Sequence, residues 1–172
     1  MVQSTSSNGG TSSREFGLSF EISPPAAVRP RTPFTLPLIV AVRPVGNPSG
    51  GSIQQLVVNA SLRNESGSAS APGLSGGLTS SVRSRQGNTI SGFARFNSLT
   101  IQQPGRYRIR VMLGAASANG VVTKTYVDSG VINVHAAAGT QRPTAVEVGR
   151  LQRLVPENLD ITTADITRWQ NA

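Results

Sequence analysis

The sequence predicts an all-β domain, a sandwich or a barrel, that ends in a short helical tail. Hydrophobic residues make up only 37% of the chain, which is low for a helical bundle. Glycine and proline together account for 29 of its 172 residues and divide it into short segments. Turn signals recur about every 8–12 residues, which is typical of seven to nine short strands in a sandwich or barrel.

The clearest strand follows the Pro104-Gly105 turn. Neighbouring side chains of a strand point to opposite faces of a sheet. One face of this strand is therefore apolar and the other carries three arginines. The apolar face comprises Tyr107, Ile109, Val111 and Leu113, and the basic face comprises Arg106, Arg108 and Arg110. A second strand, beginning at Leu99, comes before the turn.

The N-terminal part divides into a disordered segment and the first strands. Residues 1–13 hold serine, threonine, glycine and asparagine without core-forming residues, which predicts disorder. Phe16–Ile22 alternates between apolar and polar residues and predicts a strand. A loop at Ala26–Pro33 follows. Phe34–Val42 is nearly all apolar and predicts a buried strand, in which Pro37 favours an edge position or a bulge.

The central part predicts further strands around a polar connection. Asn64–Gly77 is rich in serine, glycine and alanine and predicts a mobile connection, whereas Arg83–Asn88 predicts a hairpin tip. Turns are also expected at 115–120 and 128–130. The remaining strands are expected at Ile53–Leu62, Leu78–Val82, Thr89–Phe96, Val121–Val127 and Val131–His135. We therefore assign residues 14–136 to the β-domain.

Residues 137–172 form the tail, for which two helices are expected. Thr144 and Glu147 have the spacing of a capping box, so a helix is predicted at Ala145–Leu154. A second helix is expected at Ala164–Gln170, with Thr163 as its cap. Trp169, the only tryptophan, either anchors the tail on the β-domain or binds a partner, because tryptophan is enriched in interface hot spots. In the second interpretation Leu151 and Leu154 share the partner-binding surface.

The charge distribution indicates a polyanionic partner. The whole chain carries a net charge of +8, and residues 29–110 hold ten arginines and one acid, Glu65. Phosphate neutralisation by such a basic surface supplies most of the sequence-independent affinity for nucleic acid. The alternative is that the arginines only solvate exposed strand faces.

Three groups of arginines are candidates for duplex DNA binding. Arg29 and Arg31 rank first, because guanidinium groups on a loop grip phosphates in a two-point manner and reach into a groove. Arg83 and Arg85 lie on the predicted hairpin tip. Arg106, Arg108 and Arg110 on the strand face suit nonspecific phosphate contacts.

No motif predicts an enzyme, a metal site or a cofactor. Gly73-Leu-Ser75-Gly-Gly77 has the form of a nucleophile elbow but lies in a serine- and glycine-rich connection, far from the only histidine, His135. The chain has no cysteine, and its carboxylates do not cluster. We expect neither a small-molecule substrate nor a membrane interaction. The first residues lack the apolar core of a signal peptide, which favours an intracellular protein.

The order of motifs from Phe16 onward resembles the velvet domain of fungal regulators. The similar segments are Phe20–Arg29, Pro37–Val42, Ala60–Gly67, Leu74–Gly76, Phe93–Leu113 and Val127–Val134. The block around Gly105-Arg-Tyr-Arg is the most specific. The first loop is shorter than is typical of the family, and Ala136–Thr140 stands where the family has Phe-Pro-Gly.

The resemblance implies an immunoglobulin-like sandwich akin to Rel-homology domains. It also implies DNA binding through the loop after the first strand, where Arg29 and Arg31 fall, and homodimers or heterodimers of velvet proteins. Such regulators of development and secondary metabolism act in the nucleus and cytoplasm.

Two other functions remain open from the sequence. The chain is alternatively an interaction module that acts as a dimer partner through its tail, without DNA binding of its own. An extracellular adhesion or carbohydrate-binding domain is a third possibility, which would predict glycans on Asn59 or Asn64.

Overall fold

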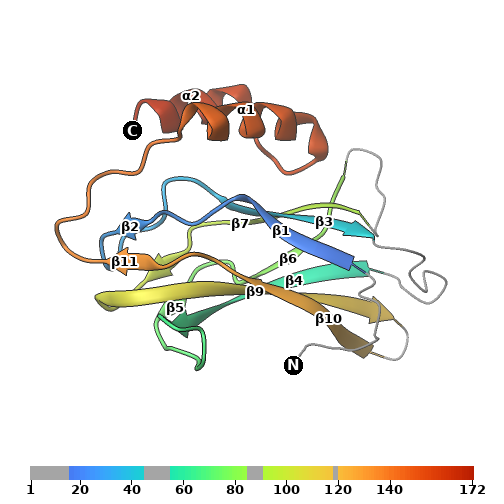
Figure 1. Cartoon of the computed structure of the whole chain (residues 1–172). Helices are drawn as coiled ribbons and strands as arrows, with labels where there is room; N and C mark the ends of the chain where they lie inside the picture. The colour runs from blue at the N-terminus through green and yellow to red at the C-terminus, as the bar shows by residue number, and fades with distance from the viewer. Residues whose placement is uncertain (1–15, 45–54, 85–90, 118–119) are drawn as a thin grey trace.

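A computed structural model describes residues 16–44, 55–84, 91–117 and 120–172 of the chain. The fold is mostly β, with two short α-helices at the C-terminal end (Figure 1). The strands are β1 (Phe16–Ile22), β2 (Ala27–Val28), β3 (Leu38–Pro44), β4 (Gln55–Asn64), β5 (Leu74–Ser75), β6 (Thr79–Ser81), β7 (Gly92–Phe96), β8 (Thr100–Ile101), β9 (Gly105–Ser117), β10 (Gly120–Asp128) and β11 (Ile132–Val134).

The elements form three layers. A small sheet with the order β1-β3-β7 lies between the helices and a larger sheet with the order β2-β11-β9-β4-β6, to which β10 is added beside β9 (Figure 1). A two-stranded ladder joins β5 to β8. One hydrophobic core fills the space between the two sheets, and a second lies between the small sheet and the helices. The chain therefore has two cores that share the small sheet.

Strand β3 is the centre of the small sheet and is buried on both faces. Val40 and Val42 point into the first core, while Ile39 points into the second. The prediction of a buried strand is confirmed, but the edge position inferred from Pro37 is wrong. β3 begins at Leu38, so Pro37 lies outside the strand and removes no hydrogen bond from its ladder.

Strand β1 has the predicted bounds but does not keep all its apolar side chains on one face. Its pairing with β3 shifts between Phe20 and Ile22, which marks a bulge. An extra residue in one strand bends it and redirects the side chains beyond. Phe16 therefore enters the first core, whereas Ile22 enters the second.

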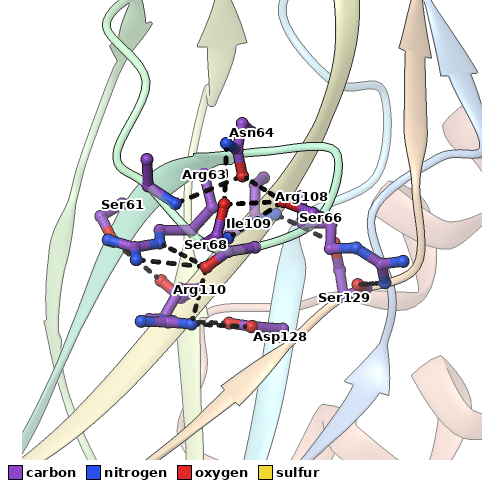
Figure 2. Close-up of polar contacts among 12 residues, drawn as sticks. Ser61, Arg63, Asn64, Ser66, Ser68, Arg108, Ile109, Arg110, Asp128 and Ser129 are labelled. Carbon is purple, nitrogen blue, oxygen red and sulfur yellow. Dashed lines mark hydrogen bonds and ion pairs between the residues drawn. The ribbon is translucent and has the colours of Figure 1, made fainter.

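Strand β9 organises the larger sheet. It pairs with β4 along one edge and with both β10 and β11 along the other. The predicted alternation is confirmed: Ile109, Val111 and Leu113 are fully buried in the first core, and Tyr107 packs against it. The three arginines of β9 alternate with these residues and so lie on the outer face of the sheet, where Figure 2 shows Arg108 and Arg110.

Several short strands lie where loops were predicted. β2 falls within Ala26–Pro33 and pairs in parallel with β11. The connection Asn64–Gly77 was predicted to be mobile, yet it contains β5 and an isolated bridge between Arg63 and Ser70. The expected turn at 115–120 begins later than predicted, because β9 extends to Ser117. Two-residue ladders carry too little periodicity to be recognised in a sequence.

The first helix of the tail has the predicted bounds, and the second begins one residue earlier than predicted. Helix α1 (Ala145–Leu154) has the predicted bounds, and Thr144 and Glu147 form the capping box. A 3-10 turn, η3 (Val155–Glu157), follows it. Helix α2 (Thr163–Gln170) is capped by Thr162 rather than Thr163, because Asp165 stands three residues after Thr162 and completes a second capping box.

The other strand predictions agree to within a few residues. β6 and β11 are shorter than expected, and β10 starts one residue earlier. The predicted N-terminal disorder, the start of the strand at 53–62 and the tip at 85–88 lie outside the described residues. Within the described part of the chain, no helix has the length and apolar character needed to cross a membrane.

Candidate nucleic-acid interface

Most of the described arginines are used to hold backbone carbonyls of this chain. A guanidinium group offers five donors in a planar fork, so one side chain can serve several oxygens. In seven arginines at least one of these donors binds a main-chain oxygen within 3.5 Å. These residues are Arg29, Arg63, Arg95, Arg108, Arg110, Arg142 and Arg150.

The three arginines of β9 are all engaged on the outer face of the larger sheet. Arg106 forms an exposed ion pair with Glu65 at 3.0 Å. Arg108 donates from Nε to the carbonyl of Glu65 at 2.6 Å and from Nη1 to the carbonyl of Ser129 at 2.9 Å. The loop after β4 therefore lies across this basic stripe and occupies its donors (Figure 2).

The carbonyl of Gly67 is the centre of this cluster. It accepts hydrogen bonds from Arg63, through Nε and Nη2, and from Nη2 of Arg110. Gly67 has φ = +79°, a conformation that favours glycine. The hydroxyl groups of Ser66 and Ser68 form a hydrogen bond, with 2.7 Å between their oxygens. These contacts hold a segment whose composition alone predicted mobility.

Arg110 carries the most buried ion pair of the cluster. Its Nε and Nη2 bind the two carboxylate oxygens of Asp128 at 2.7 and 3.0 Å. The hydrogen bond to Asp128 raises the pKa of Arg110 above its usual value. The ring of Tyr126 lies 4.1 Å from the guanidinium carbon. Arg110 is therefore neutralised and stacked within its own sheet.

The arginines near the small sheet fasten the tail. Arg83 makes an ion pair with Asp160 at 3.7 Å, and Arg85 lies outside the described residues. Arg95 donates from Nη1 to the carbonyls of Leu159 and Asp160, both at 3.0 Å. Burial lowers the pKa of Arg95 relative to its usual value. Of the two arginines in the predicted hairpin-tip site, Arg83 thus forms an ion pair with the tail.

Arg29 and Arg31 are exposed on a well-anchored loop and differ from these groups in their partners. The loop connects β2 to β3, and its backbone is held by hydrogen bonds from Arg31 N to Ile101 O at 2.8 Å and from Phe34 N to Leu99 O at 2.9 Å. Arg29 donates from Nε to the carbonyl of Ala138 at 2.8 Å. Within the described residues, neither side chain pairs with a carboxylate.

A basic groove adjoins this loop. One hollow is lined by Arg29 and the neighbouring one by Arg142, and they share the walls formed by Ala27 and residues 139–141. Arg142 was not among the predicted contacts, because its place between glutamine and proline in the tail carries no recognisable pattern. The groove depends on the tail folding back beside β2, which the separation in sequence conceals.

The residues predicted to bind a partner lie in the second core instead. Leu151, Leu154 and Trp169 are 0%, 1% and 6% exposed and pack with residues of β1 and β3. The alternative in which Trp169 anchors the tail therefore describes the structure. Nine buried residues form this core: Ile22, Leu36, Ile39, Leu151, Leu154, Leu159, Ile161, Ile166 and Trp169. These side chains are occupied by the chain's own fold.

The remaining sequence motifs are spread through the sheets. Ser75 is in β5, whose next element is the strand β6, so the strand-to-helix turn of a nucleophile elbow is not formed there. Its hydroxyl accepts a hydrogen bond from Gln102. His135 follows β11, and the described residues hold no group of three potential metal ligands. The amide of Asn59 binds Thr79 across two strands.

No protein-family model matches this sequence, and no curated protein matches it significantly. The resemblance to velvet domains therefore has no support beyond the order of the motifs.

Proposed function

We propose that this protein is a velvet-type transcriptional regulator that binds duplex DNA through the loop carrying Arg29 and Arg31 and forms dimers. In this proposal the two facing sheets are an immunoglobulin-like sandwich that presents the loop at one end. The protein would act in the nucleus and cytoplasm. The family assignment rests on the order of motifs, and the binding site rests on the loop itself.

The observation that carries the proposal is the availability of two arginines on a fixed loop. Both side chains are exposed, and the loop is held by backbone hydrogen bonds at Arg31 and Phe34. A guanidinium group already oriented before binding loses less conformational entropy when it takes up a phosphate. Arg29 meets this condition, because Ala138 holds its Nε.

The other candidate arginines support this ranking by their engagement elsewhere. Arg106 and Arg110 pair with Glu65 and Asp128, and Arg108 is bound to two carbonyl oxygens. A phosphate on the β9 face would therefore have to replace intramolecular partners. A phosphate that binds at Arg29 and Arg31 would not have to replace a carboxylate partner.

The test is a fluorescence-anisotropy titration of random duplex DNA at several salt concentrations. We compare the wild type, an Arg29→Ala, Arg31→Ala double variant and an Arg106→Ala variant. Losing two phosphate contacts should reduce the slope of log affinity against log salt by about two. Arg106→Ala should change it little. An equal loss in both variants, or no binding by the wild type at low salt, would contradict the proposal.

A second candidate function is a protein-interaction module without DNA binding, which acts as a dimer partner. It is favoured by three exposed side chains on β10: Val121, Val122 and Tyr126, at 65%, 58% and 55% exposure. All three lie on β10, at the edge of the larger sheet, where the neighbours Val121 and Val122 point to opposite faces. Sedimentation of the wild type and of a Val121→Ser, Val122→Ser variant tests self-association. A dimer that persists in the variant would remove this surface from consideration.

A further inference from the structure

The groove beside β2 brings together two arginines that are 113 positions apart in the chain. Arg29 lines one hollow and Arg142 lines the next. Both hollows contain Ala27, Gly139, Thr140 and Gln141 in their walls, so they adjoin each other, and we call the pair the groove. Thr32 and Thr35 add hydroxyl groups at the end nearer Arg29.

The two guanidinium groups are held in the same way. Arg29 donates from Nε to Ala138 O at 2.8 Å, and Arg142 donates from Nε to Ala172 O at 3.0 Å. Among the described residues, the two Nη groups of each side chain bind no oxygen of the protein. The Nη groups together form the end of the fork that matches two oxygens of a phosphate.

The engaged arginines elsewhere lack this arrangement. Arg63, Arg108 and Arg110 each use at least one Nη group for an intramolecular oxygen. Arg95 and Arg150 do the same through Nη1. On the β9 face, Arg106 also keeps its Nη groups, but it is paired with the carboxylate of Glu65, whereas Arg29 in the groove has no carboxylate partner among the described residues.

The electrostatics of the groove favour an anion. Among the described residues that line it, the one acidic side chain is Glu147, whose Oε1 accepts the backbone N–H of Thr144 at 2.8 Å in the capping box of α1. Arg142 also binds an oxygen of Ala172, the last residue of the sequence, so part of its charge is offset, and the net positive charge of the site comes from Arg29 and Arg142 together with Arg31. Arg31, on the loop next to the groove, extends the positive charge further.

We infer that Arg142 is a second phosphate contact, and that the groove between β2 and residues 139–142 receives the sugar-phosphate backbone of duplex DNA. This inference rests on the proposed function. Arg29 and Arg142 each bind one phosphate of the same strand through their paired Nη groups. The tail thereby contributes to DNA binding by placing Arg142 in the hollow next to that of Arg29.

The experiment is the same anisotropy titration with Arg142→Ala, Arg142→Lys and a control, Arg153→Ala. Arg153 is also an exposed arginine of the tail and lies on α1, away from the groove. Removing one phosphate contact should reduce the salt slope by about 0.9 and weaken binding about eightfold at 0.1 M salt. Arg142→Lys should keep the slope, because it retains the charge, and lose part of the affinity.

The results separate the inference from the function on which it rests. A reduced slope for Arg142→Ala, with the slope of Arg153→Ala unchanged, supports a phosphate contact at Arg142. Equal binding by Arg142→Ala and Arg153→Ala overturns the inference. In that case, loss of binding in the Arg29→Ala, Arg31→Ala variant still supports the proposed function. If the wild type does not bind duplex DNA, both fall. A folded Arg142→Ala variant excludes loss of the tail's structure as the cause.

Discussion

Arg110 and Asp128 form a two-point ion pair across the neighbouring strands β9 and β10, with 2.7 Å between Nε and Oδ1 and 3.0 Å between Nη2 and Oδ2. The two residues stand directly opposite each other in the ladder. Their side chains are 18% and 25% exposed, so water screens the pair less than it screens the exposed Arg106–Glu65 pair. An arginine that the sequence presents as a DNA contact is thus part of the sheet's own structure.

Replacing Arg110 by alanine should destabilise the fold by about 1–3 kcal/mol, because a partly buried carboxylate loses its charged donors. The loop at Gly67 also loses one of its anchors. The measurement is urea unfolding followed by the fluorescence of Trp169. Arg153→Ala, on an exposed face of α1, should change stability by less than about 0.5 kcal/mol. Equal effects of the two substitutions would argue against a structural role for Arg110.

The second core makes the tail necessary for stability. Leu151→Ala should cost about 2–5 kcal/mol, since it leaves a cavity between α1 and the small sheet. Val146 lies on the same helix and is 64% exposed, so Val146→Ala should have an effect within about 0.5 kcal/mol. Thermal unfolding of both variants tests this. A mild effect of Leu151→Ala would mean that the helices detach readily from the sheet.

Gly92 is expected to tolerate no side chain. It has φ = +143° and lies against the backbone carbonyl of Arg83. Arg83 and Phe93, the residue after Gly92, exchange two backbone hydrogen bonds of 2.8 Å, which hold this carbonyl in place. A Cβ at this position would overlap that carbonyl, so Gly92→Ala should cost at least about 2 kcal/mol. Gly130→Ala is the matched control, because nothing lies within 4 Å of its added Cβ. Denaturant midpoints of the two variants provide the comparison.

The cap of α2 should contribute stability that depends on pH. The backbone N–H of Thr162 and the guanidinium of Arg168 hold the pKa of Asp165 below its usual value of 3.8. Because the folded pKa is the lower one, this stabilisation is complete above pH 3.8 and is lost as the pH falls through the folded value.

We expect wild type and Asp165→Asn to differ in stability at neutral pH and to converge in acid. Trp169 lies on α2 and reports its unfolding by fluorescence. The measurement is a series of urea titrations between neutral pH and about pH 2. A stability difference that stays constant over this range would show that the ionised carboxylate of Asp165 has no part in the cap.

Local sequence patterns were sufficient to predict those strands and helices whose pattern lies within a few consecutive residues. The alternation in Phe16–Ile22 and Tyr107–Leu113 predicted two strands, and Thr144 with Glu147 predicted the start of α1. These features depend on side-chain direction and on capping within one turn, which the sequence order alone sets. The β-rich class and the two C-terminal helices follow from the same local physics.

The tertiary structure decided how the arginines and the tail are used. The sequence shows that Arg106, Arg108 and Arg110 share a face, but only the folded chain brings Glu65, Gly67, Asp128 and Ser129 to their donors. Likewise, the composition of the tail left Trp169 as either an anchor or a partner contact, and burial against the small sheet makes it an anchor.

The physical reason is that charge and hydrophobicity are properties of single residues, whereas neutralisation and burial depend on neighbours distant in the chain. The sequence by itself determined the strands, the helix caps and the excess of positive charge. The packing of the tail against β3 and the bonding of each guanidinium group decided which arginines keep donors for a ligand. The site that we propose, at Arg29, Arg31 and Arg142, depends on this tertiary arrangement.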